Sequence, residues 1–329
     1  MTNTYLIDFH THVMTPGGLS RLCPAEQGSA FFRYAVPLLE KLSHLSEPLH
    51  NSLLRHAAMH YRDPVSRFVY ACCGQLGLME ALRLFKKYDL ARLLRTMDRD
   101  GIGHAVIASI EPLTLTQEIL DLTGHVSERV SVFASFNKDT EDAPAYIENL
   151  LRSGRVAGIK LHPIVGGWTC GELYEATREV VALATDKELP VLIHTGHIPV
   201  EALQGIGGCS EVPALEPLVS AFPKARFVLA HIGWESWRAV LRLAARYPNI
   251  LVETSWQPAR VIRRAVDALG AARVLFGSDY PLFGQPHALR QARNALSPRE
   301  FVQVASSNAR GLLRLTPAHG HWQRKSSAS

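Results

Sequence analysis

The sequence predicts a single α/β domain with the fold of a (β/α)8 TIM barrel, in which a helix follows each of eight parallel strands. Short β-branched and apolar runs recur eight times, amphipathic stretches lie between them, and polar residues end at least four of the runs. The expected strands are residues 5–12, 104–110, 130–136, 156–162, 190–195, 227–231, 250–254 and 274–279. Alternating strands and helices indicate a parallel sheet, and eight strands are the number that closes into a barrel.

The connections between the runs have the periodicity of helices, because apolar residues recur three and four positions apart. The clearest examples are residues 78–97, 143–151, 173–185, 237–247 and 259–269. A doubly wound open sheet is the rival architecture. It is disfavoured because no glycine-rich phosphate-binding turn follows the first run, and because several different runs end in polar residues.

Two segments fall outside this repeat. The connection 13–77 is far longer than the usual few residues and contains helical pieces at 37–45 and 49–61. We expect it to form a helical cap over the site or a contact between subunits, which leaves a homodimer open. Residues 317–329 lack periodicity and are expected to form a flexible tail, so the catalytic domain would span residues 1–316.

Composition argues against two classes of partner. The formal net charge is +5, but the basic residues are scattered among acidic ones rather than clustered, so a nucleic-acid partner is not expected. No uncharged apolar stretch is long enough to span a bilayer, and no signal segment opens the chain. The five cysteines, Cys23, Cys72, Cys73, Cys170 and Cys209, form no CxxC pair and read as reduced thiols. A cytoplasmic enzyme acting on a small molecule is the expectation.

Histidines and an aspartate gather where the expected strands end. His10 and His12 lie two positions apart on the first run, so both side chains face the same side of the sheet. Alone this pair is a weak signal, because buried histidines often only form hydrogen bonds. However, His194, His231 and Asp279 end three further runs. One shared cation would satisfy all of these buried polar groups, at the end of the barrel where such enzymes carry their chemistry.

At these residues the chain resembles the amidohydrolase superfamily, in particular the branch that includes aminocarboxymuconate-semialdehyde decarboxylase and related hydrolases. The matching motifs occur in family order at residues 7–12 (IDFHTH), 94–102 (LRTMDRDGI), 105–107 (AVI), 158–163 (GIKLHP), 194–196 (HTG), 230–233 (AHIG) and 275–281 (LFGSDYP). The resemblance covers nearly the whole chain except 13–77 and the tail. As a set, the motifs are specific for the fold and the metal site but not for the substrate.

The resemblance implies a divalent metal held by His10, His12, His194 and Asp279. It also implies that Asp279 takes the proton from the metal-bound water, and that His231 is either a ligand of a second metal or an acid/base group. Zinc is the expected ion, with manganese, iron or cobalt as alternatives, because His/Asp sites accept these metals according to supply. Such an ion lowers the pKa of its water to about 7, so hydroxide exists at neutral pH.

Lys160 has two interpretations. Some members of the superfamily carry at this position a lysine modified by CO2, whose carbamate bridges two metals, so the chain would then bind two metals rather than one. Alternatively, an unmodified Lys160 pairs with an acidic neighbour or binds a substrate carboxylate. The carbamate matters because an unmodified ammonium has no lone pair and would repel the cations.

Three tryptophans follow the expected strands within a few residues. Trp168, Trp234 and Trp256 come after the fourth, sixth and seventh runs. Indoles placed there would line the mouth of the pocket and bind substrate. The alternative is that they only pack against the cap.

The sequence therefore predicts a metal-dependent hydrolase of an ester, thioester, lactone or amide of a small organic substrate. Asp279 would act as general base and then as acid, and His231 would stabilise the developing oxyanion or bind a second metal. The alternative is a metal-dependent, non-oxidative decarboxylase of an aromatic or unsaturated carboxylic acid. Several decarboxylases of this group carry an acidic residue at the position of Trp234, so its absence favours hydrolysis. A non-catalytic metal-binding barrel is the remote third interpretation.

Overall fold

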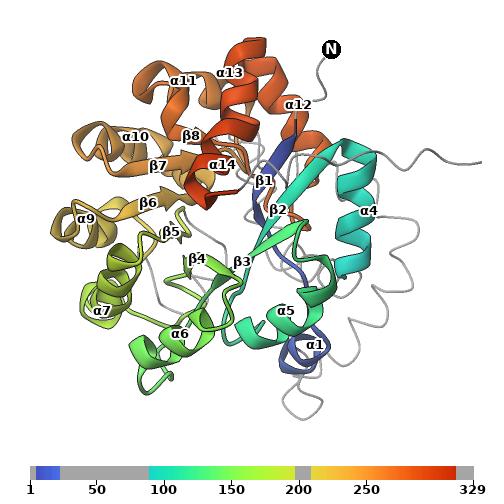
Figure 1. Cartoon of the computed structure of the whole chain (residues 1–329). Coiled ribbons are helices and arrows are strands. Elements are labelled where there is room, and N and C mark those ends of the chain that lie inside the picture. The colour runs from blue at the N-terminus through green and yellow to red at the C-terminus, as the bar shows by residue number, and fades with distance from the viewer. Residues whose placement is uncertain (1–4, 23–88, 197–208, 316–329) are drawn as a thin grey trace, which may run out of the picture.

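Eight parallel strands form one sheet in the computed structural model, which describes residues 5–22, 89–196 and 209–315 (Figure 1). The strands are hydrogen-bonded in chain order from β1 to β8. They are β1 (Leu6–Thr11), β2 (Ile102–Ala108), β3 (Val130–Ala134), β4 (Val156–Leu161), β5 (Pro190–Ile193), β6 (Arg226–Leu229), β7 (Ile250–Glu253) and β8 (Val274–Leu275). Each overlaps an expected strand, and β2 begins and ends two residues earlier than expected.

The sheet closes where the chain beyond β8 meets β1. The Phe9 amide donates to the Phe276 carbonyl at 2.9 Å, and the Asp279 amide donates to the His10 carbonyl at 2.8 Å. The His12 amide then donates to the Tyr280 carbonyl at 2.7 Å. The first and last strands are therefore neighbours, and the predicted (β/α)8 barrel is confirmed.

Helices surround the barrel (Figure 1). They are α1 (Pro16–Leu22), α4 (Leu90–Asp100), α5 (Thr116–Thr123), α6 (Ala143–Leu151), α7 (Leu173–Asp186), α9 (Val212–Ala221), α10 (Trp237–Arg246), α11 (Ala259–Leu269), α12 (Gln285–Ala295), α13 (Pro298–Val302) and α14 (Asn308–Leu313). In the parts of the chain that the structure describes, no helix is long and apolar enough to cross a membrane.

Helix α4 illustrates how the sequence sets element boundaries. The Asp89 side chain accepts a 2.8 Å hydrogen bond from the Arg92 amide, which satisfies a donor that a helix start leaves without a partner. The helix ends at Gly101, whose φ of 73° suits a residue that lacks a Cβ atom. Most of the long connection 13–77 and the tail 317–329 lie outside the described residues, as do residues 78–88 of the helix expected to precede β2.

Two apolar clusters fill the structure. The larger one packs the outer face of the strands against the helices. The smaller one takes alternate residues from six strands, among them Ile7, Phe9, Phe133 and Val228, and forms the inner core. Phe9 and Phe133 meet edge to face with ring centroids 5.5 Å apart. This inner core supports the carboxyl ends of the strands, where the polar residues gather.

Candidate metal centre

Six strand ends place ionisable residues in one buried group. The contributors are His10 and His12 at the end of β1, Lys160 on β4, His194 after β5, His231 after β6, Glu253 on β7 and Asp279 after β8. All of them are buried. All of them except Glu253 are candidates from the sequence.

His10, His12 and Asp279 form the tightest set of potential ligands. The Asp279 Oδ1 atom lies 3.1 Å from His12 Nε2 and 3.5 Å from His10 Nε2. Two ligands of one tetrahedral ion, each at about 2.1 Å, lie about 3.4 Å apart. The three atoms therefore have the spacing and the donor types that a divalent transition metal requires.

The Asp279 backbone helps to create this spacing. Its φ is 56°, a left-handed conformation that is uncommon for a non-glycine residue. Burial alone would raise the pKa of the Asp279 carboxyl, but neighbouring His10 and hydrogen bonds from His12 and Trp256 outweigh burial and lower the pKa. The Asp279 carboxyl is therefore ionised at neutral pH, which is the state that binds a cation.

Lys160 points into the same group. Its Nζ atom lies 3.0 Å from His10 Nε2, and the side chain is completely buried. Burial lowers the pKa of the Lys160 ammonium to about 8, although the carboxylates of Asp279 and Glu253 favour the charged form. Lys160 therefore competes with a cation for the lone pair of His10.

His194 lies beside His231 rather than within the set formed by His10, His12 and Asp279. Its Nδ1 atom is 3.1 Å from His231 Nε2, and its ring stacks on His162 with centroids 4.1 Å apart. The His194 Nε2 atom is buried and has no hydrogen-bond partner among the described residues. A buried nitrogen of this kind is a suitable metal ligand, because binding a cation would remove the cost of leaving it unsatisfied.

Glu253 is the functional residue that the sequence analysis missed. Its Oε1 atom accepts hydrogen bonds from His10 Nδ1 at 2.9 Å and from the His231 amide at 2.8 Å. The signal was present, because a glutamate ends the otherwise apolar strand β7. Burial lowers the pKa of both His10 and His231, and nearby Lys160 lowers them further, so both imidazoles are neutral near pH 7.

Trp256 and Trp234 lie at this centre. The Trp256 Nε1 atom donates a 2.6 Å hydrogen bond to Asp279 Oδ2. The rings of Trp234 and Trp256 have centroids 6.0 Å apart, and the Phe283 ring lies 5.2 Å from that of Trp256. These three rings form an aromatic wall beside the aspartate.

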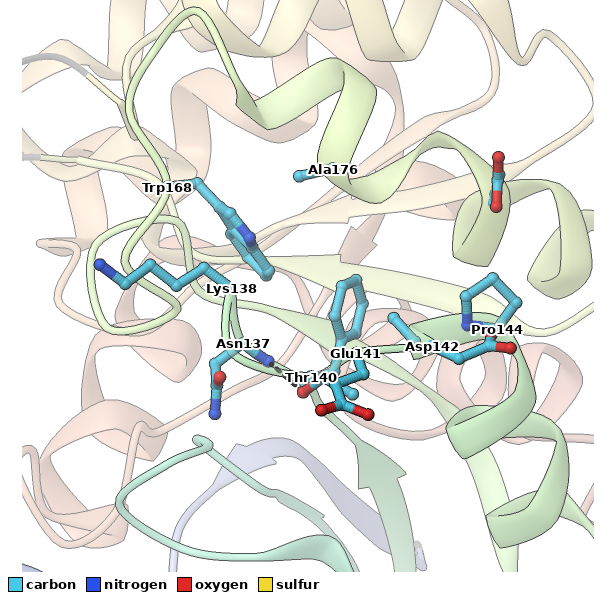
Figure 2. Close-up of a pocket in the computed structure, with 11 residues that line it drawn as sticks. Asn137, Lys138, Thr140, Glu141, Asp142, Pro144, Trp168 and Ala176 are labelled. Atoms are coloured by element: carbon cyan, nitrogen blue, oxygen red, sulfur yellow. Dashed lines mark hydrogen bonds between the residues drawn. The ribbon is translucent and has the colours of Figure 1, made fainter.

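Trp168 lies at a separate pocket. This pocket has a volume of about 450 Å³ and is formed by the loops after β3 and β4 and by the first turns of α6 and α7. Figure 2 shows Trp168 and Lys138 on its wall, with Glu141 and Asp142 on the opposite side. Trp168 packs against Phe136 with ring centroids 5.1 Å apart. The wall contains none of the seven residues of the buried group described above.

Comparisons with known proteins agree with this architecture. L-fucono-1,5-lactonase from Burkholderia ambifaria is 26% identical over 224 residues, which cover 61% of this chain and 71% of the lactonase. A dihydroxybenzoic acid decarboxylase from Polaromonas with bound manganese has a TM-score of 0.60 at 14% identity, covering 97% of this chain and 100% of the other. An amidohydrolase from Burkholderia multivorans with bound zinc has a TM-score of 0.54 at 17% identity, covering 70% and 89%.

The family model described as "Amidohydrolase" matches residues 7–315, which include all of the barrel strands except Leu6 of β1, and every residue of the buried group. The fold, the order of the motifs and the polar strand ends are thus those of one family of enzymes. This chain belongs to the amidohydrolase family.

Proposed function

We propose that this protein is a metal-dependent hydrolase that opens lactones or cleaves related carboxylic esters. The observation that carries the proposal is the convergence of His10, His12 and Asp279 in a buried site at the carboxyl end of the barrel, where Asp279 Oδ1 lies 3.1 and 3.5 Å from the two histidine Nε2 atoms. The similarity to a lactonase over 61% of this chain supports lactones as the first substrate class to test.

The metal would be held by His10, His12, His194 and Asp279. Two imidazoles and a carboxylate already converge. The buried Nε2 atom of His194, which has no hydrogen-bond partner among the described residues, would supply a fourth donor. We propose zinc as the ion, with manganese, iron or cobalt as alternatives for the same donor set. When bound, the ion would supply Lewis acidity, which polarises a carbonyl oxygen and lets water ionise near pH 7.

Asp279 would move the proton during hydrolysis. Its carboxylate accepts the proton of the attacking water, the carbonyl carbon gains the hydroxyl, and the ring C–O bond breaks. Asp279 then returns the proton to the leaving alcohol oxygen, so that a hydroxy acid is released. The hydrogen bond from Trp256 to Oδ2 keeps the carboxylate in one orientation during both transfers.

Trp234 and Trp256 would bind the apolar face of the substrate. Their rings and Phe283 form a continuous wall beside Asp279. Such a wall suits a flat or cyclic substrate, whose reactive carbonyl then faces the polar group. Trp168 would contact only a substrate long enough to reach the pocket between α6 and α7.

The contacts of the site support one metal per chain. A second metal would need a carbamate on Lys160 and the separation of His194 from His231, which lie 3.1 Å apart. The pKa of Lys160 near 8 does leave a fraction of the neutral amine that reacts with CO2. The two-metal form is therefore the alternative that metal analysis decides.

Decarboxylation is the second candidate, because one contact removes the sequence argument against it. The sequence argument against it was the tryptophan at position 234, where related decarboxylases carry an acidic residue. In the structure Glu253 supplies an acidic partner to His231 from β7, so this argument no longer separates the two reactions. Buried Lys160 could also anchor a substrate carboxylate.

The deciding experiment uses the metal-loaded enzyme in ¹⁸O-labelled water. One set of substrates contains 1,5-lactones of sugar acids, simple esters and thioesters, and the other contains aromatic and unsaturated carboxylic acids. Hydrolysis places ¹⁸O in the product carboxylate. Release of CO2 from an acid, with no ¹⁸O in any product carboxylate, would replace the hydrolase by the decarboxylase.

A further inference from the structure

We infer that Glu253 is a positioning residue that sets the tautomers of two proposed metal ligands, His10 on β1 and His194 after β5. It acts on His10 directly and on His194 through Ser255 and His231. The inference rests on the proposed metal centre. It concerns which ring nitrogen of each histidine carries the proton, because only the other nitrogen can bind a metal.

The path from Glu253 through Ser255 and His231 to His194 is called the relay below, and its first contact is made by Ser255. Its Oγ atom donates a 2.6 Å hydrogen bond to Glu253 Oε1, and it also lies 2.6 Å from His231 Nδ1. A hydroxyl has one proton, which Ser255 gives to the carboxylate. Ser255 therefore accepts from His231, and the proton of the neutral His231 ring lies on Nδ1.

The contact between His231 and His194 sets the tautomer of His194 in turn. A neutral imidazole with its proton on Nδ1 has a lone pair on Nε2. His231 Nε2 faces His194 Nδ1 at 3.1 Å, so His194 donates from Nδ1 and keeps the lone pair on its Nε2 atom. This is the buried atom with no hydrogen-bond partner in the described ranges. The relay thus prepares His194 to bind a cation through Nε2.

Glu253 sets the tautomer of His10 directly, without an intervening residue. Its Nδ1 atom lies 2.9 Å from Glu253 Oε1, and a carboxylate can only accept. The lone pair of His10 is therefore on Nε2, the atom that faces His12 and Asp279. One carboxylate oxygen thus orients ligands that lie 184 residues apart in the chain, at positions 10 and 194.

The relay also assigns a role to His231. Both of its ring nitrogens are used, one by Ser255 and one by His194. His231 in this arrangement has no proton to give to a substrate oxyanion and no lone pair to give to a second metal. The geometry makes it a positioning residue for His194.

Matched variants of His231 test the relay. In His231→Gln, an amide oxygen lies about where Nε2 lies and accepts the His194 proton, whereas His231→Leu offers no acceptor and leaves the His194 ring its hydrogen bond with the Gly196 backbone. Both residues are unbranched at Cβ, so they meet the φ of 58° at this position with similar backbone cost. A lost orienting partner typically lowers metal affinity by about 10- to 100-fold. We therefore expect that loss in His231→Leu, and affinity within about threefold of wild type in His231→Gln.

The affinity for Zn²⁺ alone is measured by competition with a chromophoric chelator. Equal affinities of His231→Leu and wild type, or equal losses in both His231 variants, would overturn the inference. A wild-type protein that binds no Zn²⁺ would instead overturn the proposed function, so the two failures are distinguishable.

A spectroscopic measurement covers the case in which His231→Leu does not fold. In ¹⁵N-histidine-labelled metal-free protein, we expect the His194 ring to show a protonated Nδ1 and an unprotonated Nε2. Ser255→Ala should mix the two tautomers and weaken Zn²⁺ binding about tenfold. Ser306→Ala is the control, because buried Ser306 donates to the Tyr5 carbonyl before β1, away from the relay. An unchanged His194 pattern in Ser255→Ala contradicts the relay.

Discussion

Trp256 holds one oxygen of Asp279 while the other oxygen faces the histidines. The indole Nε1 atom donates to Oδ2 at 2.6 Å, and Oδ1 lies 3.1 Å from His12 Nε2. A carboxylate with both oxygens engaged in this way has one orientation. The order of the site therefore depends on an aromatic residue that is neither a metal ligand nor an acid.

Trp256→Phe should lower kcat by about tenfold, because a hydrogen bond to a charged group contributes about 1.5 kcal/mol. KM should change less, since phenylalanine keeps most of the aromatic wall. Steady-state kinetics on the best substrate of the ¹⁸O panel measure both. Trp168→Phe is the matched control at the separate pocket and should keep kcat on a small substrate. Equal losses in both variants would refute the role of the Trp256 hydrogen bond.

Removing one metal ligand should remove the metal. We expect His10→Ala and His12→Ala to lose bound metal and activity, because the remaining donors leave an open and weak site. Chelation of the wild-type protein should lower its thermal midpoint, and Zn²⁺ should restore it. His125→Ala, on an exposed histidine, should behave as wild type in elemental analysis and calorimetry. Full activity in verified metal-free protein would end the metal proposal.

Lys160→Met separates the two interpretations of Lys160, because they predict opposite effects of the substitution on Zn²⁺ binding. If Lys160 is unmodified, its loss removes a group 3.0 Å from His10 Nε2 that competes for the lone pair. We then expect one metal per chain in both proteins and tighter Zn²⁺ binding in the variant. A bridging carbamate gives the opposite result, a fall from two metals to one. Lys138→Met, at the separate pocket, is the control.

Gly277→Ala should disturb the metal centre by displacing Glu253. A Cβ atom at this position would lie 2.2 Å from Glu253 Oε2 and 3.1 Å from the His10 Cβ atom. The glutamate must move, so we expect weaker Zn²⁺ binding and a loss of stability of about 1 to 3 kcal/mol. Gly311→Ala, in helix α14 with nothing within 4 Å, is the control. It should be neutral or stabilising, because alanine favours a helix. Chelator competition and urea unfolding measure the two effects.

Glu111 should make stability depend on pH. Burial raises its pKa above the ordinary value of 4.5, despite hydrogen bonds from Thr116 and Tyr146. The folded protein therefore retains a proton that the unfolded chain has lost. The free energy of unfolding contributed by Glu111 falls as pH rises from about 4.5 through the raised pKa.

In Glu111→Gln, the free energy of unfolding should lack this dependence on pH. Urea unfolding of the metal-free protein at several pH values, compared with wild type, measures the difference. Exposed Glu128→Gln serves as the control. Parallel pH profiles for wild type and Glu111→Gln would show that the carboxyl titrates alike in both states.

Strand periodicity was sufficient to predict the barrel, because each strand has a recognisable apolar run and eight alternating strands and helices close into a barrel. The same reasoning placed His10, His12 and Asp279 together, since strand ends meet at one rim. The pairing of His194 with His231 was not predictable, because it depends on left-handed residues after β6, including His231 and Ile232. Glu253 was missed because a single glutamate in a strand resembles an edge residue until its partners are known.

The seam between the first and last strands has a consequence for how the protein is made. The Asp279 amide donates a hydrogen bond to the His10 carbonyl, so Asp279, which follows the last strand, is positioned by the first strand. During synthesis, His10 leaves the ribosome about 270 residues before Asp279, at roughly 5–20 residues per second. For those seconds the histidines can bind metal only loosely. If the proposed centre holds the metal, tight metal binding therefore marks the moment at which a nascent chain has closed its barrel.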